Sequence, residues 1–198
     1  MSPRGVATPE IRSQLFEAAD RVMVREGPDG LTSRAVTDEA GCAKGMLHNH
    51  FDDFESFLAQ FALDRIHRIV HQLEGLQAQA GRASVVTNLT DAAVEVFGSN
   101  APAIASLITS RPSVFAKVQS AMTADGSPFT EIERSFAEYL EKEKKIGRVA
   151  PGADAKMLAF TIFGSLHNSF FMGGQRSLAR ARVREVVKAL VGNSLTAS

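Results

Sequence analysis

Apolar residues recur at helical spacing along most of the 198-residue chain. Residues three or four positions apart lie on one face of an α-helix, whereas a half-buried strand would need strict alternation. One such stripe comprises Ile11, Leu15, Ala18, Ala19, Val22 and Met23, and a longer one comprises Phe54, Phe57, Leu58, Phe61, Ile66, Ile69, Val70 and Leu73. No alternating β-branched run of strand length stands out. The pattern predicts an all-α fold.

Glycine and proline residues divide the rest of the chain into helix-sized segments. The sequence predicts further helices over residues 84–99, 101–109, 113–124, 128–145, 153–172 and 178–191. The segment 155–172 is apolar nearly all round, so it needs cover on most of its faces. The last predicted helix carries an apolar stripe of Val183, Val186, Val187 and Leu190. That stripe either completes the core of its own domain or packs against a second copy of the chain.

Composition and charge narrow the class of protein. With 44% hydrophobic and 22% charged residues, the chain is of ordinary globular composition. One cysteine excludes an internal disulfide, and the N-terminus lacks the apolar region of a signal peptide. Lys156, His167 and Asn168 interrupt the most apolar segment. We therefore expect a cytoplasmic protein with no membrane span.

The net charge of zero is unevenly distributed. Residues 1–68 carry eight Lys and Arg against eleven Asp and Glu, while the remainder carries fourteen against eleven. Neither part has the bulk positive charge of a nucleic-acid-binding module. Any DNA-binding role must therefore come from local geometry.

The stretch AGCAKGMLHNHF, residues 40–51, lies between two short predicted helices. Thr32 is placed to cap a helix that ends at Ala40, and Gly41 suits the left-handed residue after that end. After a three-residue turn, a second short helix spans residues 44–51, with Leu47 directed inward. The pattern Asp52-x-x-Glu55 then predicts a capping box for the next helix. Two short helices joined by a tight turn predict a helix-turn-helix, whose second helix fits the major groove.

A metal site is the competing interpretation of this stretch, because Cys42, His48 and His50 lie within nine residues. Side chains two positions apart on a helix point about 200° apart, so the two histidines cannot share an ion. A second candidate set comprises Asp64, His67, His71 and Glu74, spaced along one helix face. That set leaves a metal-sensing regulator as an alternative function.

The segment GPDGLTSRAVTDEAGCAKGMLHNHFDDFESFL, residues 27–58, resembles the TetR/AcrR family of transcriptional regulators. The resemblance begins near Ile11 and ends near Leu58. It implies a three-helix DNA-binding domain in residues 1–52, then a helical effector-binding and dimerisation domain in residues 53–198. The partners it implies are a double-stranded DNA operator, a small-molecule effector and a second copy of the chain. Because no catalytic motif assembles, we expect no enzymatic activity and no cofactor.

The resemblance also implies the residues that contact DNA. Ser33 would contact phosphate, and Arg34 a base or phosphate. The residues that would approach the groove or the backbone from the second helix are Lys44, Gly45, Met46, His48, Asn49 and His50.

Three positions depart from the family pattern. His48 replaces the usual tyrosine, Ala43 the usual hydroxyl cap, and Phe54 the usual lysine.

Eight of the thirteen phenylalanines lie between Phe97 and Phe171. An aromatic region with few polar groups suits a pocket for a mostly apolar small molecule. We expect that pocket to be lined by Phe115, Tyr139, Phe163, His167 and Phe171. The sequence therefore predicts a ligand-responsive regulator, a repressor released from a palindromic operator. The alternatives are a metal-sensing regulator on the same scaffold, or a helical binding protein or enzyme with a degenerate DNA-binding domain.

Overall fold

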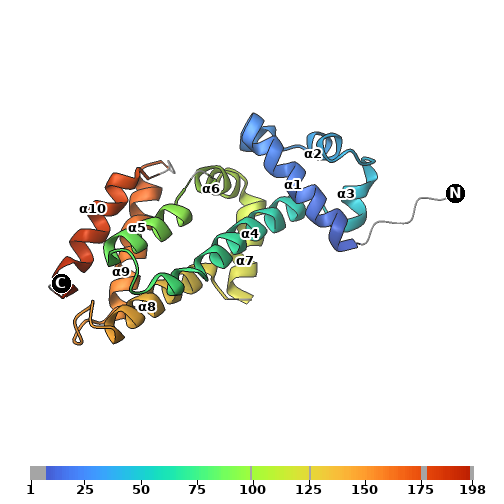
Figure 1. Ribbon diagram of the computed structural model, residues 1–198. Helices are drawn as coiled ribbons and strands as arrows, with labels where there is room; N and C mark the ends of the chain where they lie inside the picture. The colour runs from blue at the N-terminus through green and yellow to red at the C-terminus, as the bar shows by residue number, and fades with distance from the viewer. Residues whose placement is uncertain (1–7, 99, 125, 175–177, 197–198) are drawn as a thin grey trace. The chain divides into compact units, whose positions relative to one another are not determined.

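The computed structural model describes residues 8–98, 100–124, 126–174 and 178–196. The α-helices, in chain order, are α1 (Thr8–Glu26), α2 (Ser33–Ala40), α3 (Gly45–His50), α4 (Phe54–Leu73), α5 (Val85–Val96), α6 (Ala101–Thr109), α7 (Pro112–Ala124), α8 (Pro128–Lys145), α9 (Ala155–Met172) and α10 (Arg180–Val191) (Figure 1). The described ranges also contain 3-10 helices: η1 (Pro28–Gly30) between α1 and α2, η2 (Leu76–Gln79) between α4 and α5, and η3 (Gly192–Ser194) after α10. Within the described ranges the only β-type pairing is one bridge between Val149 and Leu195. The prediction of an all-α fold is confirmed.

The chain forms two compact units. The first unit combines the N-terminal helices, up to Arg65, with the segment Ala103–Ala121. The second combines Ile66–Pro102 with the chain from Met122 onward. Helix α4 thus contributes residues to both units, and a segment from the middle of the chain joins the N-terminal helices. The division into a DNA-binding domain of residues 1–52 and an effector-binding domain of residues 53–198 stays a prediction.

The first unit is built on the apolar stripe of α1. Leu15, Ala18 and Val22 are fully buried. Around Phe16 of α1 gather the rings of Phe51, Phe57 and Phe61, with centroids 5.6–6.0 Å from its own. These contacts hold α1 against α4 and against the end of α3, because tilted aromatic pairs at this separation pack favourably.

The start of α4 differs from the predicted capping box. The Asp53 carboxylate, rather than that of Asp52, accepts a hydrogen bond from the Ser56 amide at 2.5 Å. Phe51 has an extended backbone (φ −140°, ψ 142°) and a buried ring, so the chain re-enters helix one residue later than the pattern predicts. The Ser56 hydrogen bonds are the main cause of a lowered pKa at Asp53, because they stabilise its charged form.

The second unit packs α8 against α9, and α10 against α5 and α9. The predicted ranges for α6 and α8 coincide with the observed ones. Helices α5 and α9 begin one or two residues later than predicted, because Ser84 and Asp154 take the capping positions and accept hydrogen bonds from amides of the first turn. Ser99, at the end of the range predicted for α5, lies outside the described residues.

A buried polar network crosses this unit. The Tyr139 hydroxyl donates to the Glu143 carboxylate at 2.5 Å and accepts from the Asn88 amide at 2.9 Å. Glu143 is fully buried, and the Arg148 guanidinium lies 3.4 Å from its second oxygen. The network joins α5 and α8 through groups that are hydrogen-bonded or ion-paired, as buried polar groups require.

Across the described ranges, no single helix combines the length and apolarity needed to cross a membrane. The residues of α5 and α6 taken together, with a bend between them, meet the criterion by length and composition alone.

Candidate DNA-binding site

Helices α2 and α3 form the predicted helix-turn-helix. The Thr32 hydroxyl accepts from the Ala35 amide at 3.1 Å and starts α2. Gly41 ends α2 with φ +66°, a left-handed conformation that glycine adopts without a Cβ penalty. The Gly41 and Cys42 amides return to the carbonyls of Asp38 and Thr37, which completes a tight C-cap. Both capping predictions are confirmed.

Ion pairs tie α2 to α1. The Glu39 carboxylate lies 2.6 Å from the Arg21 guanidinium and 2.8 Å from that of Arg25. These hydrogen bonds, first from Arg21 and then from Arg25, lower the pKa of Glu39. Because both arginines are exposed and Glu39 is half-buried, we expect these pairs to orient α2 more than they stabilise the fold.

Cys42 lies in the turn with a partly buried side chain. Burial raises the pKa of its thiol, which favours the protonated form over the thiolate that binds metal. Among the described residues, no three His, Cys, Asp or Glu side chains are grouped to hold a metal ion. This finding covers Cys42, His48 and His50, and also Asp64, His67, His71 and Glu74.

Helix α3 has one buried side chain, Leu47, and a largely exposed opposite face. Six residues of this helix and its N-terminal turn are predicted to contact DNA. Of these, Lys44, Gly45, His48 and Asn49 are exposed, and Met46 and His50 are half-buried. The structure brings all six onto a single short helix and its N-terminal turn. An α-helix presenting polar side chains in this way can enter a major groove.

The two α2 residues predicted to contact DNA, Arg34 and Ser33, differ in how accessible their side chains are to a partner. The Arg34 side chain is 84% exposed, with its guanidinium 3.5 Å from the Asp38 carboxylate one turn later. The Ser33 hydroxyl is buried and makes no hydrogen bond to the described residues. A phosphate contact from Ser33 therefore requires its side chain to change rotamer.

Two departures from the family pattern have structural counterparts. Helix α3 begins without a side-chain cap hydrogen bond, and its N-cap position is taken by Lys44, one residue after Ala43. Phe54 stacks on Phe57, with centroids 5.7 Å apart and planes inclined by 17°. Position 54 therefore serves packing within the unit.

Arg12 was not among the predicted site residues, yet it contacts the end of α3. Its guanidinium donates to the His50 carbonyl at 2.8 Å and lies over the Phe51 ring, 4.4 Å from the centroid. It also donates to the Gln60 side chain of α4. No sequence pattern identifies this contact, because its partners lie 38 and 48 residues away.

Three residues of the predicted ligand pocket form a continuous aromatic cluster in the second unit. The His167 ring lies 4.6 Å from that of Phe171 and 5.5 Å from that of Phe163, between centroids. Phe129, which the sequence did not single out, lies 5.4 Å from His167. Burial lowers the pKa of His167, which favours the neutral imidazole and suits apolar contacts.

The other two predicted pocket residues lie elsewhere. Tyr139 is fully buried, and its hydroxyl is already shared between Asn88 and Glu143. Burial is the main cause of the raised pKa of this phenol. Phe115 belongs to α7 of the first unit and is 46% exposed.

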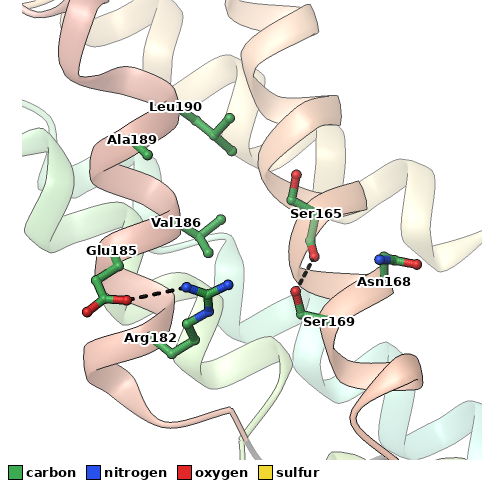
Figure 2. Close-up of a pocket in the computed structure, with 8 residues that line it drawn as sticks. All are labelled: Ser165, Asn168, Ser169, Arg182, Glu185, Val186, Ala189 and Leu190. Carbon is green, nitrogen blue, oxygen red and sulfur yellow. Dashed lines mark hydrogen bonds and ion pairs between the residues drawn. The ribbon is translucent and has the colours of Figure 1, made fainter.

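A groove of about 510 Å³ runs between α9 and α10. It is lined by Ser165, Asn168, Ser169, Arg182, Glu185, Val186, Ala189 and Leu190 (Figure 2). Val186 and Leu190 point from α10 toward α9 in Figure 2, and Arg182 is paired with Glu185 at 3.4 Å. The apolar stripe predicted on this helix is thus divided, since Val183 and Val187 are fully buried while Val186 and Leu190 line the groove.

Comparison with known proteins relates the helix-turn-helix region to transcriptional regulators. Residues 15–60 match the model for bacterial regulatory proteins of the tetR family. An HTH-type transcriptional regulator of Haemophilus influenzae is 35% identical over 63 residues, which span 32% of this chain and 32% of that protein.

Solved structures resemble the fold over nearly the whole chain. A Mesorhizobium loti MAFF303099 protein, described as a TetR-family regulator, matches with a TM-score of 0.72 and 18% identity, covering 96% of each chain. Bacillus subtilis FadR, in complex with stearoyl-CoA, matches with a TM-score of 0.59 and 17% identity, covering 90% of this chain and 97% of FadR. At these identities the likeness concerns the fold alone.

The family match covers the helix-turn-helix itself. Its span, residues 15–60, runs from the core of α1 through α2 and α3 into α4. The proteins matched in this region are transcriptional regulators and not enzymes. Residues 15–60 of this chain thus match the tetR family of bacterial regulatory proteins, and the chain as a whole shares its fold with a solved TetR-family structure.

Proposed function

We propose that this regulator is a ligand-responsive repressor that binds a pseudo-palindromic operator as a homodimer and is released by a mostly apolar small molecule. The observation that carries the proposal is the division of α3 into a buried Leu47 and an exposed polar face. A helix held by its apolar side presents Lys44, His48 and Asn49 to a partner. The proposed contacts are those of the sequence: Ser33, Arg34, Lys44, Gly45, Met46, His48, Asn49 and His50.

The homodimer is supported by the surfaces of α9 and α10. Met157 and Phe160 of α9 are each 58% exposed in the single chain. Large exposed apolar side chains on one helix face are typical of a surface covered by a partner. A second copy placed by two-fold symmetry would cover the same residues on both chains. Two copies of α3 would then enter successive major grooves about 34 Å apart.

The apolar effector is supported by the cluster of Phe163, His167 and Phe171. A neutral imidazole among aromatic rings gives an apolar wall with one polar anchor, as small-molecule sites commonly have. Phe115 and Tyr139, which the sequence also predicted as lining residues, lie outside this cluster. The fold is shared with FadR, whose solved complex holds stearoyl-CoA, so long-chain acyl compounds are the first class to test.

The test begins with selection of duplexes from a random-sequence pool by the purified protein. Recovery of an inverted repeat, bound by two copies of the chain per duplex, is the expected result. Loss of that binding on addition of an apolar compound would support repression with release. By thermodynamic linkage, the duplex must then weaken binding of the compound by the same factor. Recovery of no sequence, or a monomer on one asymmetric site, would contradict the proposal.

A further inference from the structure

We infer that Arg12 is a positioning residue for the recognition helix: it sets the orientation of α3 through the C-terminal end of that helix and does not contact DNA itself. The inference rests on the proposed DNA-binding function of α3. It concerns a side chain on α1, outside the proposed contact residues.

Helix α3 is held by few interactions of its own. It has six residues, one buried side chain and no side-chain N-cap. Helices this short are marginal in water, so the orientation of α3 depends on tertiary contacts. Leu47 anchors one point of the helix, and a second fixed point is needed to define the direction of its exposed face.

Arg12 supplies that second point. Its guanidinium donates to the His50 carbonyl at 2.8 Å, and this carbonyl belongs to the last turn, where helix carbonyls lack partners within the helix. A cation at a helix C-terminus also interacts favourably with the helix dipole.

The same guanidinium lies over Phe51, the residue that ends α3. Phe51 is only 4% exposed, and its ring makes an edge contact with Phe57 of α4 at 5.0 Å. A second donor of Arg12 meets the Gln60 side chain on α4. One planar group thus joins α1, the end of α3 and α4, which a lysine could not reproduce because it lacks the flat two-donor fork.

These contacts also argue against a direct contact between Arg12 and a DNA phosphate. Its donors are directed at a carbonyl and an amide oxygen within the unit, and its face covers an aromatic ring. A phosphate-binding arginine needs those same donors. Arg12 therefore affects DNA affinity through the position of Lys44, His48 and Asn49.

The first experiment needs no DNA. Amide hydrogen exchange is measured in the free, full-length protein for the parent, Arg12→Lys and the matched control Arg134→Lys, whose arginine is exposed on α8. We expect exchange over residues 45–51 to accelerate roughly tenfold in Arg12→Lys, the loss expected for a charged hydrogen bond, and to stay at the parent rate in the control. Parent-like exchange in Arg12→Lys would overturn the inference.

The second experiment separates position from contact. The affinity of each protein is measured over a salt series for a duplex selected by the parent and for a scrambled duplex of equal composition. We expect Arg12→Lys to lose roughly tenfold on the selected duplex, with an unchanged affinity and salt slope on the scrambled one. If Arg12 bound phosphate, lysine would largely preserve affinity, and Arg12→Ala would weaken both duplexes and reduce the salt slope by about one unit.

A negative result in one experiment does not prevent the other from testing its own claim. If the parent selects no duplex, the proposed DNA-binding function fails, while hydrogen exchange still decides whether Arg12 holds α3. Should Arg12→Ala not fold, Arg12→Lys retains the charge and the alkyl chain and decides the question by itself.

Discussion

The Lys117 ammonium on α7 donates to the Ser56 hydroxyl on α4 across 2.9 Å, although 61 residues separate them in the chain. It also lies 3.6 Å from the Asp53 carboxylate, which caps α4. Nearby, Arg111 donates to the Leu31 carbonyl at 3.2 Å, just before α2. The segment Ala103–Ala121 thus holds both the entrance to the helix-turn-helix and the helix that follows it.

Arg111→Ala should therefore loosen the start of α2. The Pro28 and Leu31 carbonyls would lose a charged donor, and Glu55 an ion-pair partner at 3.7 Å. We expect a loss of about 1 kcal/mol of stability, since the group is partly exposed. Urea denaturation measures this, with Lys142→Ala, exposed on α8, as control. Equal midpoints in all three proteins would show that Arg111 does not stabilise the unit.

Arg34→Ala and Lys44→Ala should each weaken operator binding. A side chain that reads a base should cost about 1–3 kcal/mol and relax preference at one base pair. A phosphate contact should instead weaken binding to all sequences and reduce the salt slope by about one unit. Fluorescence anisotropy over a salt series distinguishes these results. Unchanged binding in both variants would mean that α2 and α3 do not face the DNA.

Tyr139→Phe should destabilise the second unit. The change removes the donor to Glu143 and the acceptor for Asn88 while leaving both groups buried. We expect a cost of about 1–3 kcal/mol in the free energy of unfolding. Combining it with Glu143→Gln should give a coupling of about 0.5–3 kcal/mol, because the two groups share a hydrogen bond. Additive losses would indicate that the two side chains act independently.

The stability of the protein should include a component from His167 that depends on pH. Burial lowers the pKa of His167 in the folded state, so the unfolded chain binds more protons below the ordinary value of about 6.5. The contribution of the neutral His167 side chain to the free energy of unfolding is present above about pH 6.5. It is lost as the pH falls toward the pKa of His167 in the folded state. Denaturation at about pH 7.5 and about pH 5.5 should therefore show a smaller difference for His167→Phe than for the parent. An identical difference would place His167 in a solvated environment.

Much of the fold follows from local patterns in the chain. The 3.6-residue spacing of apolar side chains predicted the helices, because that spacing places them on one face whatever they later contact. Thr32 and Gly41 marked the ends of α2 because capping acts between residues a few positions apart. The cap of α4 was misplaced by one residue, since the buried ring of Phe51, a tertiary contact, sets where that helix begins.

Contacts between distant segments could not be read in the same way. Arg12 meets His50, and Lys117 meets Ser56, only after the helices have packed, and no periodicity connects residues 38 or 61 positions apart. The Tyr139 hydroxyl likewise finds Asn88 across 51 residues, so a side chain predicted as a ligand anchor has its polar atom engaged within the core. The sequence by itself determined the helices and the residues of α3, because these depend on neighbours along the chain. Tertiary structure decided which charged groups hold that helix in place, because donors and acceptors pair according to distance in space.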